Sequence, residues 1–92
     1  MRIEALEIHD GVLDKIETRH GIEFYEVKEA CYSNERHMRR AREGLYKVFS
    51  RTEAGRYILV VLADRGEGLF GIVTARDMTG GERRLYIRQR GG

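Results

Sequence analysis

The stretch that decides the fold is LYKVFSRTEAGRYILVVLADRGEGLFGIVTARD, Leu45–Asp77. Its apolar residues recur with a period of two in three separate runs, and this alternation is typical of strands. The segments between the runs, TEAG and RGEG, consist of turn-forming residues and are short enough for hairpins. The stretch therefore predicts an antiparallel meander of three strands over residues 45–51, 56–64 and 69–77.

The middle strand of this meander is apolar on both of its faces, which places it at the centre of the sheet with cover on each side. Along the last strand, simple alternation assigns one set of side chains to a single face. That set is Phe70, Ile72, Thr74 and Arg76. Alternation also assigns Lys47 and Arg51 to one face of the first meander strand. From these faces we form the hypothesis of a groove on the sheet, rimmed by Lys47, Arg51, Arg65 and Arg76.

The segment after the meander predicts a capped, basic helix. Thr79 matches a helix N-cap and Glu82 follows three residues later, which completes a T-x-x-E capping box. The helix is expected to begin near Gly80 and to carry Arg83 and Tyr86 in its first turns. Cations and an aromatic ring should therefore lie close to the strand end, an arrangement that favours binding of a polyanion.

Weaker patterns precede the meander. An imperfect strand is expected around Leu6, after which Asp10 can cap a helix that Gly21 ends. A second helix is expected from about Phe24, and the polar segment 33–44 is expected to be a connection. The predicted order is β-α-α-β-β-β-α in one α+β domain spanning residues 1–92, with an antiparallel meander sheet packed against helices.

Charge and composition narrow the class of protein. Residues 1–34 carry four basic and eight acidic residues, whereas residues 35–92 carry thirteen basic and seven acidic ones. Arginine outnumbers lysine fourteen to three, which favours phosphate contact, although the same residues could simply solvate the surface. Cys31 is the single cysteine, and no apolar run approaches 18 residues. These features predict a soluble cytoplasmic protein without a disulfide or membrane segment.

Histidine is the side chain best suited to exchange protons near neutral pH. His20 ends the first helix, where it is either a catalytic group or a C-terminal cap. His9 and His37 are expected to be exposed and without a function. No histidine pair has the spacing of a metal site, so no metal or other cofactor is expected.

The sequence resembles the BrnT group of bacterial toxins, which are ribonucleases of type II toxin-antitoxin modules with a RelE-like fold. R-H-G-I-E-F at Arg19–Phe24 resembles the start of that family's second helix, and Gly55 with Arg56 resembles its G-R-hydrophobic strand. The most specific match is T-A-R at Thr74–Arg76 followed by E-R-R-L-Y at Glu82–Tyr86. The family's initial Trp-Asp pair is replaced by His9 and Asp10, and its asparagine before the histidine by Ile16.

The resemblance implies a metal-independent endoribonuclease that cleaves RNA by attack of the 2′-hydroxyl. It also implies a cognate small DNA-binding antitoxin that buries the cationic groove. Arg65 and Arg76 are expected to contact phosphate and stabilise the transition state, and His20 to transfer a proton. Glu82 is an alternative proton carrier, but its capping-box role is favoured. The expected RNA-binding residues are Lys47, Arg51, Arg83 and Tyr86, the last by stacking on a base.

Three alternatives stay open at this stage. The same basic face could bind nucleic acid or a protein without turnover, and the chain could be a divergent, inactive toxin. By analogy of fold alone, it could inhibit a protein target such as a topoisomerase. Cleavage of a defined RNA would distinguish the ribonuclease from these three alternatives.

Overall fold

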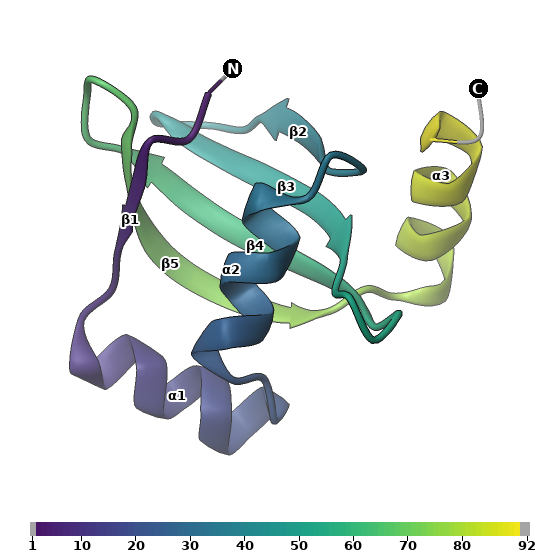
Figure 1. Cartoon of the computed structure of the whole chain (residues 1–92), viewed down its shortest axis with the longest axis horizontal. Helices are drawn as coiled ribbons and strands as arrows, with labels where there is room; N and C mark the ends of the chain where they lie inside the picture. The colour runs from purple at the N-terminus through teal and green to yellow at the C-terminus, as the bar shows by residue number, and fades with distance from the viewer. Residues whose placement is uncertain (1, 91–92) are drawn as a thin grey trace.

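The structure is a computed structural model that describes residues 2–90. Five strands and three helices occur among these residues (Figure 1). In chain order they are β1 (Ala5–Glu7), α1 (Asp10–His20), α2 (Phe24–Tyr32), β2 (His37–Arg40), β3 (Leu45–Arg51), β4 (Tyr57–Asp64), β5 (Leu69–Asp77) and α3 (Gly80–Arg90). None of these helices is long and apolar enough to cross a membrane. The predicted α+β class and the predicted helices are confirmed.

The strands form one open sheet in the order β1-β5-β4-β3-β2. Strands β3, β4 and β5 are the predicted antiparallel meander, and β1 pairs with β5 in parallel. Strand β4 lies at the centre, as expected from its apolar residues. Its predicted cover on both faces is only partly observed, because Val61 remains half-buried whereas Ile58, Val60 and Leu62 are fully enclosed.

The prediction that residues 33–44 form only a connection is wrong. Within that segment, His37–Arg40 forms strand β2, which pairs with β3 in antiparallel register. Alternation of apolar and polar residues could not reveal this strand, because Met38 is its only apolar side chain. As an edge strand it is held by its backbone pairing, and its arginines project into solvent.

Helices α1 and α2 cover one face of the sheet, and Figure 1 shows α2 crossing in front of the strands. The main core lies between these two layers, with Ile16, Ile22 and Val27 from the helical segment. From the sheet it takes Val48, Ile58, Val60, Leu62, Phe70, Ile72 and Ala75. Cys31 is enclosed in the same core, and burial raises the pKa of its thiol to about 12, so that this cysteine stays protonated.

The ends of α1 differ in how well they were predicted. The N-cap is His9 rather than Asp10, and no side chain caps the helix; Asp10 lies in the first turn, where its charge favours the helix dipole. At the other end, Gly21 is the C-cap with φ of 62°, a left-handed conformation that glycine adopts without strain. The predicted end of this helix is therefore confirmed.

The capping box predicted for α3 is present. The Thr79 amide donates to Glu82 Oε1 at 2.9 Å, and the Glu82 amide donates to Thr79 Oγ1 at 3.1 Å. Helix α3 lies on the opposite face of the sheet from α1 and α2, where Tyr86 packs against Phe49 and Leu59. The Tyr86 hydroxyl also donates to the Glu35 carbonyl at 2.8 Å. A second, smaller core therefore attaches this helix to the sheet.

Simple alternation along β5 fails because the strand contains a β-bulge. The pairing with β4 shifts between Val61 and Leu62, so that Thr74 lies opposite Val61 and Ile72 opposite Leu62. One extra residue in β5 reverses which side chains face the helices beyond that point. Ala75 consequently joins Phe70 and Ile72 in the core, whereas Thr74 and Arg76 turn to the opposite face, contrary to the prediction that they share a face with Phe70.

Candidate nucleic-acid interface

The sheet surface opposite α1 and α2, here termed the open face, is covered only at one end by α3. The register places side chains in rows across the strands. One row contains Arg39, Lys47, Val61 and Thr74, and the next contains His37, Phe49, Leu59 and Arg76. Tyr86 of α3 packs on Phe49 and Leu59 in the second row. The first row has no such cover, so its cations remain exposed.

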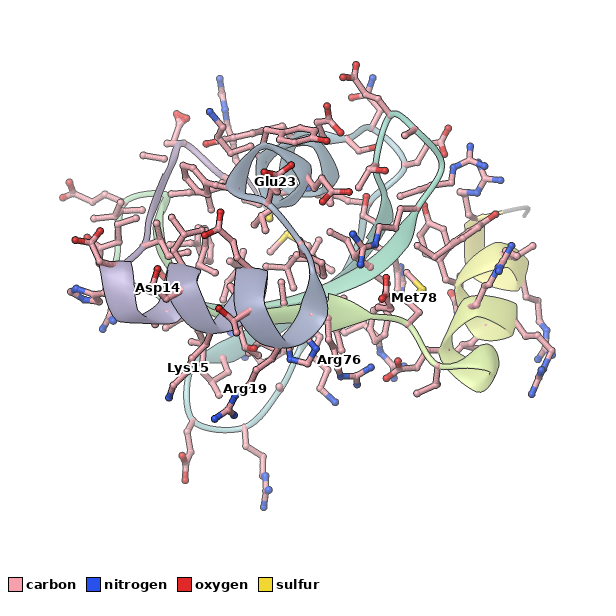
Figure 2. All side chains as sticks on the ribbon, turned by 90° about the horizontal axis from the view of Figure 1, so that it is seen from below. Asp14, Lys15, Arg19, Glu23, Arg76 and Met78 are labelled. Carbon is pink, nitrogen blue, oxygen red and sulfur yellow. The ribbon has the colours of Figure 1, made fainter. Side chains whose placement is uncertain are left out.

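Arg76 lies on the open face but is held by a carboxylate. Its Nη1 and Nη2 donate to the two Glu82 oxygens at 2.8 and 2.9 Å, and Nη1 also donates to the Asp77 carbonyl at 3.0 Å. The Arg76 guanidinium lowers the pKa of Glu82 to about 2, so this pair is fully ionised near neutral pH. Figure 2 shows Arg76 on the side of the sheet away from Glu23 and α2. An RNA phosphate at Arg76 would compete with Glu82.

The other two arginines predicted for the rim are paired as well. Arg51 donates to Glu35 at 3.0 Å. Arg65 lies 3.3 Å from Glu7, and its guanidinium passes directly over Gly71, where a side chain would leave it too little room. Because Gly71 and Arg76 occupy opposite ends of β5, Arg65 and Arg76 share the open face but lie on the order of 13 Å apart. They do not converge on one phosphate.

Lys47, the remaining predicted rim residue, is exposed and makes no contact with a carboxylate among residues 2–90. Its neighbours across the strand pair were not predicted to take part. Arg39 lies directly opposite Lys47, and His37 lies opposite Phe49 in the next row. The His37 ring is partly exposed, with its centroid 6.5 Å from that of Phe49. Recognition of β2 as a strand was the signal needed to find both residues.

Arg83 lies at the start of α3, with its guanidinium carbon 4.2 Å from the centre of the Tyr57 ring. The expected stacking of Tyr86 on an RNA base is wrong, because this ring is only 1% exposed and its hydroxyl is engaged by a backbone carbonyl. Tyr57, which packs edge-on against Tyr86, also lies on the open face and is more exposed than Tyr86. The sequence placed Tyr57 in the middle strand of the meander but did not indicate it as a site residue.

His20 is not placed with Arg76. It ends α1, and its imidazole acts on Asp77, whose pKa is lowered first by Arg56 and to a lesser extent by His20. Asp77 pairs with Ile58 in the main core, so it faces the helices, whereas Arg76 faces the other way. The His20 carbonyl accepts a hydrogen bond from Arg56 at 2.9 Å. Its surroundings are therefore those of a helix end.

Two further features bear on the chemistry. Within residues 2–90, no group of three or more His, Cys, Asp or Glu side chains is arranged to hold a metal ion. A hollow of about 920 Å³ lies between the end of α2 and the β3–β4 turn, where Glu29 and Glu53 stand beside Lys28 and Arg51. Its mixed charges do not form a site for an anion, and the open face remains the cationic surface of interest.

Comparison with solved structures shows that this chain shares its fold with a known protein. One structure of this fold is the crystal structure of the Brucella abortus ribonuclease toxin BrnT, which matches with a TM-score of 0.69 and 9% sequence identity. The match covers 82% of this chain and 96% of that chain. No protein-family model and no curated protein sequence matches this chain. The BrnT-like fold that the sequence predicted is therefore confirmed from the structure.

Proposed function

We propose that this chain is a BrnT-type endoribonuclease that cleaves RNA on its open face and is held inactive in the cytoplasm by a small DNA-binding antitoxin. The observation that carries the proposal is the likeness to a ribonuclease toxin together with a sheet face that presents Lys47, Arg76 and Arg83 on the side left free by α1 and α2. The antitoxin would cover this same face, since neutralising its cations prevents RNA from binding.

The reaction requires no group that the chain lacks. The 2′-hydroxyl oxygen attacks the adjacent phosphorus, the bond from phosphorus to the 5′-oxygen breaks, and a 2′,3′-cyclic phosphate forms. One proton leaves the 2′-hydroxyl and one must reach the 5′-oxygen, which water can supply. Lys47 stabilises the charge that develops on the phosphate oxygens, and Arg76 holds another phosphate of the same strand. Arg51 and Arg83 flank the Tyr57 ring and hold the neighbouring backbone, while Arg65 serves a more distant phosphate.

We assign the transfer of the first proton to His37 in preference to His20. His37 lies on the open face, diagonally across the β2–β3 strand pair from Lys47, whereas His20 interacts with Asp77 on the other face of the sheet. A neutral imidazole at His37 can accept the 2′-hydroxyl proton of RNA laid across β3. Glu82 is left with its structural role, because it already receives three hydrogen bonds from Arg76 and Thr79.

The test compares three histidine variants in a gel assay of single-stranded RNA cleavage. His37→Gln is expected to lower the rate by about 10² to 10⁴, the usual contribution of a general base. His9→Gln is the matched control, because His9 is exposed and its side chain makes no capping bond. His20→Gln should cleave at close to the normal rate.

Two outcomes would contradict the proposal. Normal cleavage by His37→Gln, with loss of cleavage in His20→Gln, would return proton transfer to His20. If the folded wild-type protein binds RNA but leaves it whole, the chain is a binding module and not a nuclease. The presence of an open reading frame for a small DNA-binding protein beside this gene would support the antitoxin.

A further inference from the structure

We infer that the β2–β3 hairpin forms a second phosphate-binding site, which holds single-stranded RNA beyond the point of cleavage. The site consists of Arg39 on β2 and Arg42 in the turn, beside Lys47 on β3. The inference rests on the proposed function, because the hairpin site is one part of the proposed RNA-binding surface. The hairpin site adds two arginines from residues 33–44, a segment that the sequence predicted to be only a connection.

The first argument is a charge conflict within the sheet. Arg39 and Lys47 are directly opposite each other and share the open face, where two like charges destabilise the strand pair. No carboxylate of residues 2–90 lies within ion-pair distance of Arg39, Arg42 or Lys47. Several arginines nearer α3 and β1 are matched with acids, as for Arg76 with Glu82 and Arg65 with Glu7. An external anion is what would relieve the conflict on the hairpin.

The second argument is the shape of the surface. A hollow of about 580 Å³ lies on the hairpin. It is lined by Arg39, Arg40, Ala41, Arg42, Glu43, Leu45 and Lys47. Glu43 is the single acid in this lining, and Arg40 is turned toward the Tyr46 hydroxyl at 3.4 Å. The hollow therefore carries a clear excess of positive charge.

The third argument is position. The row of Arg39 and Lys47 continues over Val61 to Thr74, two residues before Arg76 on β5. Three strand spacings, about 14 Å, separate β5 from β2, a span that a few nucleotides can bridge. An RNA strand that enters beside Arg76 can cross the sheet and leave along the hairpin. Arg39 and Arg42 then contact phosphates that take no part in the reaction.

Charge chemistry favours RNA over an acidic protein as the occupant. The hollow offers guanidinium groups, which pair with phosphate through two parallel hydrogen bonds. Its apolar members, Ala41 and Leu45, are both half-buried, and no aromatic residue lines it. A stable protein interface usually has an aromatic or large apolar residue buried at its centre, and this hollow offers none. The site is therefore suited to a sugar-phosphate backbone.

The experiment measures binding of a fluorescent single-stranded RNA of about 12 nucleotides at several salt concentrations. An RNA with 2′-methoxy groups is used, because it cannot be cleaved and binding is then independent of activity. The double variant Arg39→Gln/Arg42→Gln should reduce the slope of log K against log salt by about 1.4, or about 0.7 for each lost phosphate contact. Affinity should fall roughly tenfold near 0.1 M salt.

The charge-matched control is Arg2→Gln/Lys28→Gln, which removes two exposed cations that do not line the hairpin hollow. The control should leave the slope unchanged. With cleavable RNA, the hairpin variant should raise KM and keep kcat, because Arg39 and Arg42 contact phosphates other than the reacting one. Circular dichroism should show that the hairpin variant is at least as stable as the wild type, since one like-charge pair is removed.

The outcomes separate this site from the proposed function. A normal salt slope in the hairpin variant, with cleavage intact in the wild type, overturns the hairpin site alone. A reduced slope in a protein that never cleaves RNA supports the hairpin site and removes the nuclease. If the variant loses affinity for poly-glutamate but not for RNA, the hairpin recognises an acidic protein and the RNA site is wrong.

Discussion

At the scale of single residues, Glu82 joins two roles in one carboxylate. It completes the capping box of α3 with Thr79, and it also holds the Arg76 guanidinium through two hydrogen bonds. Because Arg76 is a candidate phosphate ligand, Glu82 fixes its position and at the same time neutralises its charge. Stability of the helix start and affinity for RNA are therefore opposed at this residue.

Replacement Glu82→Gln separates the two roles, because glutamine can still accept the Thr79 amide in a capping box but carries no charge. The folded pKa of Glu82, about 2, is below its ordinary value, so the ion pair stabilises the protein fully above about pH 4.5 and is lost as the pH falls toward 2. After allowance for the partial exposure of Arg76, the variant should lose on the order of 2 kcal/mol at pH 7.

Thermal unfolding of both proteins between pH 7 and pH 3 provides the measurement. The stability of Glu82→Gln should decline less steeply in acid than that of the wild type. A smaller decline will persist, because Arg56 lowers the pKa of Asp77 in the same direction. Affinity for RNA should rise, since Arg76 is no longer neutralised. Identical acid profiles in the two proteins would show that the pair contributes nothing to folding.

At the scale of elements, the β2–β3 turn is strained by its own sequence. Glu43 has a φ of 59°, a left-handed conformation that costs a residue with a Cβ about 1 kcal/mol. Glu43→Gly should therefore stabilise the protein by about 0.5 kcal/mol, after the greater freedom of glycine in the unfolded chain is counted. It should also tighten RNA binding, because it removes the only acid that lines the hairpin hollow.

The chain offers a matched control for this change. Glu67 in the β4–β5 turn has a φ of 54°, so Glu67→Gly should bring a similar gain in stability. It lies outside the hairpin hollow and should leave the contribution of the hairpin to RNA binding as it is. Equal increases in RNA affinity from both glycine variants would show that net charge, and not the hairpin, determines binding.

Elements whose own residues carry a strong signal could be predicted from the sequence, and those that depend on partners could not. The meander was predictable because Ile58, Val60 and Leu62 alternate within one strand, and α3 because its cap is local. Strand β2 exists through its backbone pairing with β3, which leaves no pattern in H-M-R-R. The bulge in β5 is likewise a feature of the strand pair, and this is why the face of Arg76 was misassigned.

The candidate site was predictable only in its type. An arginine-rich second half of the chain indicated a polyanion, and Lys47 and Arg51 of β3 were correctly assigned to one face. The burial of Tyr86 could not be foreseen, because its neighbours Phe49 and Leu59 are distant in sequence. For the same reason His37 was passed over, since its position depends on a strand that the pattern did not reveal.

At the scale of the whole molecule, Arg56 connects the layers. Its guanidinium donates to the carbonyls of His20 and Gly21 at the end of α1, both at 2.9 Å. It also donates to Asp77 on β5 at 2.8 and 3.1 Å and lies 3.3 Å from Glu26 on α2. One planar group thus joins both helices to the sheet, which explains the need for arginine at this position.

Arg56→Lys retains the charge but cannot make this set of bonds. The variant should be less stable by about 2 to 3 kcal/mol, the usual value of hydrogen bonds between charged groups lost at one site. Chemical denaturation measures the change. Arg84→Lys is a suitable control, because Arg84 is an exposed residue of α3 with no ion pair in residues 2–90. Equal stability of the two variants would show that Arg56 is dispensable.

The extra residue in β5 has an electrostatic consequence for the molecule as a whole. Arg76 and Asp77 are adjacent, and the extra residue before them determines which one lies on the open face and which one faces the helices. If β5 kept all its residues but paired with β4 without a bulge, the two side chains would exchange, turning an acid outward and a base inward. Deletion of Val73 would instead leave both side chains where they are, because Ile72 and Thr74 would then occupy consecutive positions of an unbroken ladder. The electrostatic polarity of the protein's two sides is therefore set by the parity of one strand.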